Sequence, residues 1–347
     1  MNGFSIVHLN PCAPLQLTSE AAAELGLPPL IQNFHSLCPL EDLPLADEQP
    51  SVSLGIRTCV IKGVSMVDGA AYGLRRIDGR QVLPSPGLLK SAHETVQRWS
   101  CVANHPNAVG LRGVFASSEY GGVSSLYFVH DYHPGAVSLH FRHLQSQRPA
   151  SEDELWSYLT QLAAVTRVAH SSGLAFRPEC LIPSKVLLTS GGRLRVGSIG
   201  ILDVLDGERV QNEDLTVLQR RDLLGVGKLI LSLATVGCEM GVGPLDHCGL
   251  HYSVELVRLI NSLMMASEGN HLSSWQHLAG ALSERSLAAL DSANMHNDAL
   301  LHELAKEVEN GRLLRLLVKL GLINERPGGN FSVSEVVLWC YRQLHCC

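Results

Sequence analysis

The stretch from Trp156 to Leu205 constrains the fold of this chain more than any other. Its first half carries small and apolar residues at three- and four-residue spacing: Leu159, Leu162, Ala163, Thr166 and Ala169. This spacing predicts a buried amphipathic helix that ends at Gly173. Two short apolar runs follow, at 185–189 and 194–196, and a Ser-Gly-Gly turn separates them. We therefore expect a helix, an irregular loop and then a β-hairpin.

This layout resembles the catalytic and metal-binding loops of protein kinases. A kinase has His-Arg-Asp where this chain has Phe176-Arg177-Pro178, a magnesium-binding Asn where it has Lys185, and Asp-Phe-Gly where it has Ser198-Ile199-Gly200. Phosphoryl transfer needs a carboxylate that orients the hydroxyl and oxygen ligands that hold magnesium. Because proline, lysine and serine do not supply these groups, we expect no catalytic residue and no metal ligand. The alternative is an atypical active kinase that uses Glu179 or Asp203.

The composition indicates a globular chain. Its 347 residues are 46% hydrophobic, which is enough for a sizeable core and for two domains. Ten cysteines lack CxxC pairs, so we expect reduced thiols rather than a disulfide scaffold or a zinc ribbon. Without a secretory signal or an apolar run near the roughly 20 residues that cross a bilayer, we expect a cytoplasmic protein, including in processing bodies, with no membrane contact. The net charge of -6 comes without a basic run, so any RNA contact should be weak or indirect.

Residues 1–50 and 51–130 differ in pattern. The first segment carries seven prolines, too many for a domain core, and we interpret it as an extended arm on the following domain. The second segment resembles a kinase N-lobe. It has an expected helix at 86–101 and expected strands at 60–64, 72–77, 109–115 and 125–129.

Arg75 is the expected phosphate contact of this lobe. It occupies the position of the strand lysine of kinases, and its guanidinium can fork onto phosphate oxygens. The nearest candidate for its usual glutamate partner is Glu94. The glycine-rich phosphate loop is degraded, because only Gly55 can be placed and the next two glycines are replaced by Arg57 and Val60. The alternative interpretation of Arg75 is a solvated strand edge.

Residues 131–281 resemble a kinase C-lobe. They open with a hinge-like run at 131–138, which in a kinase grips adenine through backbone groups. A helix that begins near Asp222 resembles the buried helix whose aspartate ties down the backbone of the catalytic loop. The segment between Gly200 and Asp222 lacks Ala-Pro-Glu, so most of the platform for a peptide substrate is missing.

Residues 282–310 carry a heptad rhythm. Seven residues fall on its alternating seam positions: Leu287, Leu290, Asn294, Asn297, Leu301, Leu304 and Val308. This spacing keeps one stripe facing a partner helix, and buried seam asparagines select register and partner number. We therefore predict a specific coiled-coil homodimer. The alternative is a helix that lies on its own domain.

The most specific string in the sequence is LAKEVENGRLLRLLVKLGLINERP, at 304–327. It resembles the signature of the regulatory pseudokinase subunit of the PAN poly(A)-nuclease deadenylation complex. Other landmarks of that family are recognisable at 34–37, 74–77, 131–136 and 194–196. The resemblance implies an α+β, bilobal protein-kinase-like fold, a pseudokinase, followed by a long coiled-coil helix. A helical knob should come next, and 311–347 resembles only its truncated first part.

For function, the resemblance implies a scaffold rather than an enzyme. Members of the family bind ATP without transferring phosphate, dimerise, and recruit a catalytic nuclease subunit that shortens mRNA poly(A) tails. Poly(A)-binding protein and silencing adaptors are further candidate partners. By motif, the expected nucleotide contacts are Arg75, Asp131, Tyr132, His133, Pro134, Gly135, Ala136, Val137, Ser138, Ser184 and Lys185. A third interpretation is a plain interaction module whose cleft is empty.

Overall fold

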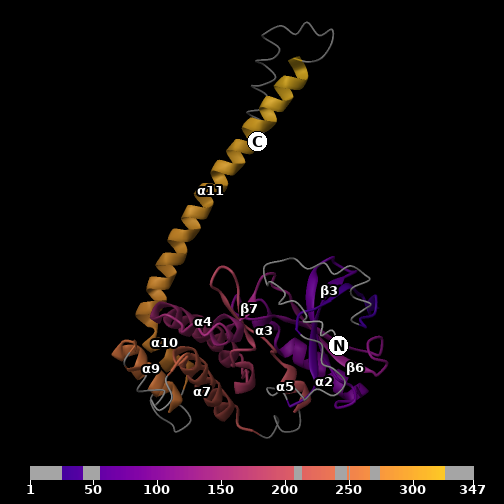
Figure 1. Cartoon of the computed structure of the whole chain (residues 1–347), viewed down its shortest axis with the longest axis vertical. Coiled ribbons are helices and arrows are strands. Elements are labelled where there is room, and N and C mark those ends of the chain that lie inside the picture. The colour runs from indigo at the N-terminus through magenta and orange to yellow at the C-terminus, as the bar shows by residue number, and fades with distance from the viewer. Residues whose placement is uncertain are drawn as a thin grey trace, which may run out of the picture. The chain divides into compact units, whose positions relative to one another are not determined.

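The computed structural model describes residues 26–41, 55–206, 213–238, 248–249, 251–265 and 274–324. The chain divides into two compact units between Arg285 and Ser286. The first unit has one lobe built on a six-stranded sheet and one lobe that is mostly helical (Figure 1). Residues 1–25 and 42–50 of the predicted arm and 325–347 of the predicted knob lie outside the described ranges.

The N-lobe is an antiparallel sheet with the strand order β1-β2-β3-β4-β6-β5. Its strands are β1 (Leu30–Ile31), β2 (Phe34–Pro39), β3 (Thr58–Ser65), β4 (Ala71–Ile77), β5 (Leu111–Ser117) and β6 (Ser125–Asp131). Residues of β3 alternate between buried and half-buried, which is the period of a strand with one face on a core. The four strands expected in this lobe are confirmed.

Helix α2 (Pro86–Arg98) covers one face of this sheet and is followed by the short α3 (Ser100–Ala103). It begins where the hydroxyl of Ser85 accepts a hydrogen bond from the N–H of Leu88 at 3.1 Å. Pro86 occupies the first turn, where a missing N–H does no harm. The inner side of α2 packs on β4, β5 and β6 in one apolar cluster.

Residues that we expected in the N-terminal arm cover the other face of the sheet. Phe34 and Leu37 of β2 lie in one apolar cluster with the inner residues of β3 and β4, and β2 pairs with β3. The boundary expected at residue 50 is therefore wrong for residues 30–39, which belong to the lobe. Prolines are tolerated there because Pro39 ends its strand and Pro28 precedes β1.

The C-lobe combines helices with a small three-stranded sheet. Its helices are α4 (Glu152–Ser171), α5 (Ile201–Leu205), α7 (Leu215–Ala234), α9 (Val254–Met264) and α10 (Trp275–Ala281), with short turns η1 (His140–Gln145) and η2 (Pro178–Cys180). Its strands are β7 (Val137–Ser138), β8 (Val186–Leu188) and β9 (Leu194–Val196). A capping box of Ser151 and Glu154 opens α4. Antiparallel pairing of β8 and β9 confirms the predicted hairpin.

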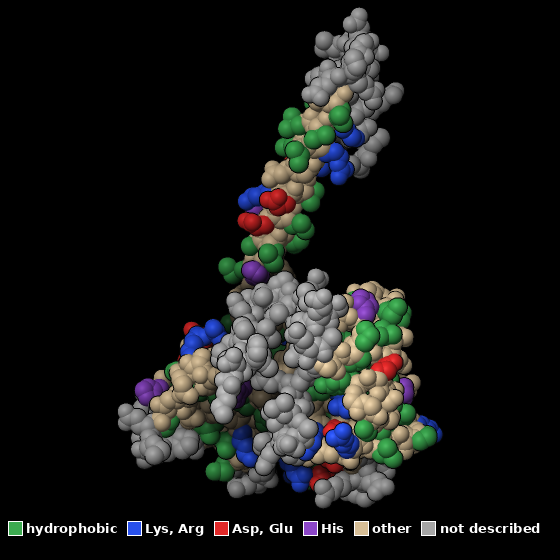
Figure 2. Space-filling model, turned by 45° about the vertical axis from the view of Figure 1, so that its right-hand side comes forward, with side chains coloured by type: hydrophobic (Ala, Val, Ile, Leu, Met, Phe, Trp, Pro, Cys, Tyr) green, Lys and Arg blue, Asp and Glu red, His purple; other side chains and the backbone are tan. Residues whose placement is uncertain are grey.

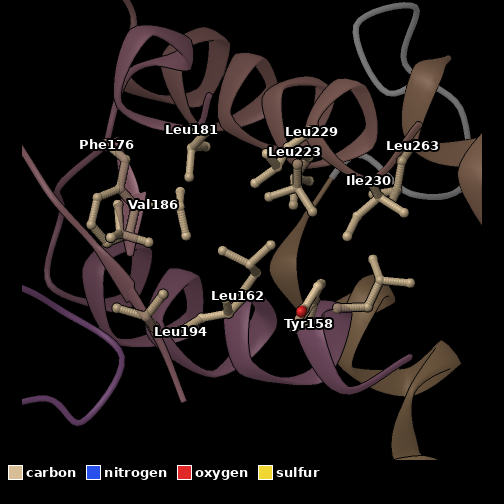
Figure 3. Packing of buried hydrophobic residues seen from close by; sticks show 14 of the residues in the cluster. Tyr158, Leu162, Phe176, Leu181, Val186, Leu194, Leu223, Leu229, Ile230 and Leu263 are labelled. Atoms are coloured by element: carbon tan, nitrogen blue, oxygen red, sulfur yellow. The ribbon is translucent and has the colours of Figure 1, made fainter. Parts of the chain in front are cut away.

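Helices α4 and α7 supply the centre of the C-lobe core (Figure 3). Leu162 of α4 faces Leu223 and Ile230 of α7, and all three are at most 1% exposed. Each such side chain contributes about 1.5–3 kcal/mol by leaving water. Helix α9 approaches α7 so closely that a Cβ on Gly227 would lie 2.9 Å from the Cβ of Leu263. Only glycine permits this contact without a shift of the helices.

Asp222 of α7 ties the loop after α4 to this core. Its carboxylate is fully buried and accepts hydrogen bonds from the backbone N–H groups of Phe176, at 2.7 Å, and of Arg177, at 2.8 Å. The Nε2 atom of His170 lies 2.9 Å from the same carboxylate. Arg177 has a φ of +76°, a conformation that costs a non-glycine residue about 1–3 kcal/mol. The expected role of Asp222 in holding this loop is confirmed.

Helix α11 (Ser283–Asn324) has 42 residues, a length of about 63 Å. Its apolar seam side chains are exposed in the single chain, from 55% for Leu290 to 64% for Leu287 (Figure 2). The predicted dimer and the alternative in which the helix lies on its own domain both stay predictions. The helix is unbroken at 310–311, where we expected the coiled coil to end and the knob to begin. Within the described ranges, no helix has the length and apolar content required to cross a membrane.

We predict that Asp222→Ala lowers the free energy of unfolding by about 3–5 kcal/mol, because two buried N–H groups and His170 lose their partner. Asp222→Asn keeps the shape and one acceptor oxygen, so it should cost about 1–3 kcal/mol. Urea unfolding of the full chain measures both values. The control is Asp153→Ala at the exposed start of α4, which should change the free energy by less than about 1 kcal/mol. An Asp222→Ala chain as stable as the control would contradict the assigned role.

Candidate functional site

A cleft of about 530 Å³ opens between β2, β3 and β4 on one side and the hinge, β7 and the loop before β8 on the other. Ten of the eleven predicted nucleotide contacts line it: Arg75, Asp131, Tyr132, His133, Gly135, Ala136, Val137, Ser138, Ser184 and Lys185. Pro134, the eleventh, is exposed and does not line it. The structure therefore brings together residues that lie more than 100 positions apart in the sequence.

Lys185 is the most buried cation of the cleft. Its backbone is fixed on both sides, since its N–H donates to the carbonyl of Ile182 and its carbonyl accepts from the N–H of Gly197, both at 2.9 Å. The residue is only 8% exposed. Burial, assisted by the charge of Arg75, lowers the pKa of Lys185 to about 8. Within the described chain its ammonium has no ion pair, so the cleft carries a desolvated positive charge that an anion would stabilise.

Arg75 supplies a second cation on the central strand β4. Its guanidinium donates to the hydroxyl of Thr58 at 3.2 Å and makes no contact with Glu94. The partner expected at Glu94 is therefore wrong, because Glu94 is exposed and the neighbouring Thr95 is the residue that α2 buries. The alternative of a solvated strand edge is also wrong, since Arg75 lies between β3 and β6 and lines the cleft.

Ser198 stands where a kinase would present a metal-binding carboxylate. It is 5% exposed, with a φ of +59°, and its hydroxyl has no hydrogen-bond partner in the described chain. A serine hydroxyl can donate to a ligand oxygen, but it carries no charge to hold a divalent cation. The left-handed Gly200 follows, where a Cβ would lie 3.0 Å from the side chain of Leu111.

The hinge is anchored on its outer side. Both oxygens of Asp131 accept hydrogen bonds from the guanidinium of Arg112, each at 2.7 Å. The N–H of Asp131 also donates to the carbonyl of Gly110 at 2.9 Å. Farther along, the ring of Tyr132 lies 5.1 Å from the ammonium of Lys62. The carboxylate of Asp131 is thus committed to β5 and offers the cleft little charge.

Neither carboxylate that could restore kinase chemistry faces the cleft. Asp203 is 8% exposed and accepts hydrogen bonds from the indole of Trp99, at 2.8 Å, and from the guanidinium of Arg177, at 3.3 Å. Glu179 is exposed and does not line the cleft. Among the described residues, no three His, Cys, Asp or Glu side chains are grouped to hold a metal ion. The atypical-kinase alternative therefore lacks its two proposed carboxylates.

Sequence reasoning missed several residues of this cleft. Cys38, Leu40 and Glu41 were assigned to the arm, yet they line the cleft beside β2. Polar His130, which directly follows the run LYFV, also lines it. This interruption of a buried strand by a histidine was the one available signal, since a polar residue there needs a partner.

The groups that this cleft leaves unsatisfied fit a nucleotide polyphosphate. Two cations, Arg75 and Lys185, make no ion pair within the described chain, although the carboxylate of Glu41 also lines the cleft, and the hydroxyl of Ser198 has no hydrogen-bond partner there. The phosphates of ATP would supply acceptor oxygens and negative charge for all three. Contact of the hinge with a base stays a prediction.

Comparisons with known proteins agree with this geometry. The family model described as the Pan3 C-terminal knob domain matches residues 275–335, which include α10 and α11. A subunit named pan3 of the PAN2-PAN3 deadenylation complex from Dictyostelium discoideum is 37% identical over 310 residues. That match covers 87% of this chain and 40% of the relative, so the chain spans less than half of the relative's length.

Two solved structures extend the comparison to the fold. The Neurospora crassa complex of PAN2 (WD40-CS1) with PAN3 (pseudokinase and C-term) contains a chain that is 28% identical, with a TM-score of 0.74. That match covers 91% of this chain and 78% of the other. The Drosophila melanogaster PAN3 pseudokinase is 31% identical, with a TM-score of 0.70, over 91% of this chain and 83% of that structure. By fold, sequence and the altered kinase positions of its cleft, this chain belongs to the PAN3 pseudokinase family.

Proposed function

We propose that this chain is a non-catalytic regulatory subunit of a poly(A)-specific deadenylase. It binds ATP in its pseudokinase cleft, forms a homodimer through α11, and recruits the catalytic nuclease subunit that shortens mRNA poly(A) tails. One observation carries the proposal: the cleft presents Arg75 and Lys185 where phosphates would lie, and among the described residues no three His, Cys, Asp or Glu side chains are grouped to hold a metal ion. The names of its relatives and the solved PAN2–PAN3 complex from Neurospora crassa support the deadenylase context.

ATP is the proposed ligand of the cleft. The hinge at 131–138 holds the base through its backbone, and Arg75, Ser184 and Lys185 hold the phosphates. When bound, ATP would supply negative charge beside the buried Lys185 and the half-buried Arg75. We further propose that this subunit acts in the cytoplasm and that it contacts RNA mainly through its partners.

We predict that ATP binds in the presence of a chelator and that magnesium adds little affinity, because protein cations balance the phosphates. Lys185→Met keeps the length of the side chain and removes its charge, so ATP affinity should fall by about ten- to a hundredfold. Isothermal titration measures both effects. The control is Lys90→Met on the exposed side of α2, which should bind as the wild type does. Strict dependence on magnesium would contradict the proposal, and absence of ATP binding would favour the empty-cleft alternative.

We predict that ATP affinity decreases as the pH rises through about 8. The pKa of Lys185 is lowered to about 8 by burial and Arg75, against weaker opposing effects of Glu41 and Cys180, so the ammonium is charged below that pH and neutral above it. The phosphates stay ionised, since their last pKa is about 6. Affinity should fall by up to about tenfold per pH unit above 8. Titrations at pH 7 to 9.5 measure it, and Lys185→Arg, which stays charged, should remove the decrease. A flat wild-type profile would contradict the role of Lys185.

We predict that Leu290→Asp combined with Leu301→Asp in the seam converts the dimer to a monomer, because the carboxylates would be buried in the partner interface. Light scattering of the full chain measures the mass. The same variant should lose co-purification with the catalytic nuclease subunit. Met295→Asp is the matched control, since Met295 is 73% exposed and lies outside the seam positions. A monomeric wild type would refute the seam, and a monomeric variant that still captures the nuclease would separate dimerisation from recruitment.

A further inference from the structure

The inner end of the cleft contains polar side chains that the protein leaves unsatisfied. His130, Lys185 and Ser198 line the cleft and are 6%, 8% and 5% exposed. Within the described ranges, the Nε2 atom of His130 and the hydroxyl of Ser198 have no hydrogen-bond partner. Because buried polar atoms are nearly always paired, an unpaired one that lines a cleft is a candidate contact for a ligand, and Nε2 of His133 in the hinge is another such atom. The ammonium of Lys185 and the hydroxyl of Ser198 can donate to phosphate oxygens. His130 is not among the proposed phosphate contacts, so its function is unassigned.

The position of His130 follows from strand alternation. Leu126 and Phe128 of β6 belong to the cluster against α2, whereas Tyr127 and Val129 belong to the opposite one. Side chains alternate along a strand, so His130 shares the face of Phe128. Arg75 lies on that face too, because it stands directly opposite Phe128 in the pairing of β4 with β6. The next residue after His130 is the first of the hinge, so His130 lies beside the end of the cleft that we assign to the base.

The protonation of His130 is set by its surroundings. Burial and the charge of Arg75 lower its pKa to about 4, so the ring is neutral. The backbone at Phe128 and Ile199 raises this pKa against the larger effect of burial. Among the described residues Nε2 has no partner, and we assign the ring hydrogen to Nδ1, so that Nε2 presents a lone pair. His130 is thus a buried acceptor that lacks a donor.

We propose that His130 selects the nucleobase, with Nε2 accepting a hydrogen bond from the amino group on C6 of adenine. A base with a carbonyl oxygen at C6 would place two lone pairs against each other and leave Nε2 unsatisfied. A phosphate oxygen would meet the same repulsion, so the base is the better partner for this atom. The inference rests on the proposed nucleotide binding and adds to it the base that the cleft prefers.

The test compares ATP with inosine triphosphate, both in the presence of a chelator. Inosine triphosphate carries oxygen in place of the C6 amino group and lacks the amino group that guanine has on C2. Isothermal titration should show that the wild type prefers ATP. His130→Met should weaken ATP by about threefold to tenfold and leave inosine triphosphate within about twofold, because only ATP loses a hydrogen bond. His130→Gln should instead strengthen inosine triphosphate, since its amide can turn an N–H toward the oxygen. His93→Met on the exposed side of α2 is the matched control and should keep wild-type affinities.

The outcomes separate this inference from the nucleotide proposal. Suppose that the wild type binds ATP and that the ratio of its affinities for ATP and inosine triphosphate is unchanged in His130→Met and His130→Gln. This result overturns the role of His130 and leaves the nucleotide proposal standing. Absence of binding of either nucleotide to the wild type overturns the nucleotide proposal and this inference together. Thermal unfolding of each variant shows whether it folds. If His130→Met does not fold, the His130→Gln ratio decides, because a purely structural role gives no reason for inosine triphosphate to gain.

Discussion

The buried carboxylate of Asp222 holds the backbone N–H groups of a loop that has no regular structure, and the cleft depends on the position of that loop. The loop continues through η2 to Lys185, whose carbonyl is in turn bonded to Gly197. Asp203 adds a second attachment, because it joins Arg177 of the loop to Trp99 beside α2. One buried carboxylate, Asp222, therefore holds the loop to the helical lobe, and the other, Asp203, links that loop to the residue beside the helix of the sheet lobe. In this chain both serve architecture, since each has its acceptor sites occupied by protein donors.

The electrostatics of the cleft follow from this arrangement. Asp203 and Asp222 are bonded to protein donors, and the cleft keeps two cations close enough that the charge of Arg75 lowers the pKa of Lys185, against a weaker opposing effect of Glu41. Desolvating like charges together is unfavourable, and a polyanion is the ligand that relieves it. A divalent metal ion would meet repulsion from the same groups. The same constellation that prevents phosphoryl transfer thus favours an anionic ligand held directly by protein cations.

Much of the fold was predictable because the strands, the buried α4 and the hairpin each show their period in a short window. Ten of the predicted cleft residues also come together, because the kinase-like order places Arg75, the hinge and Lys185 around one opening. The predictions from sequence failed where contacts between residues far apart in the sequence determine the structure. β2 is short, and several prolines lie at its end or in the segments beside it. Only the pairing of β2 with β3 makes Phe34 a core residue. Likewise, the rotation of α2 about its axis decides that Thr95 and not Glu94 is buried. The spacing of residues in the sequence does not determine which of these two neighbours faces the sheet.

The exposed apolar side chains of α11 have a consequence for the supply of this protein. A chain that exposes a long row of leucines offers chaperones and proteases the same signal as an incompletely folded protein. Copies made in excess of their partners would be removed, while assembled copies would be protected. The helix would then act as a quality checkpoint, adjusting the cellular level of the subunit to the amount of complex that can form.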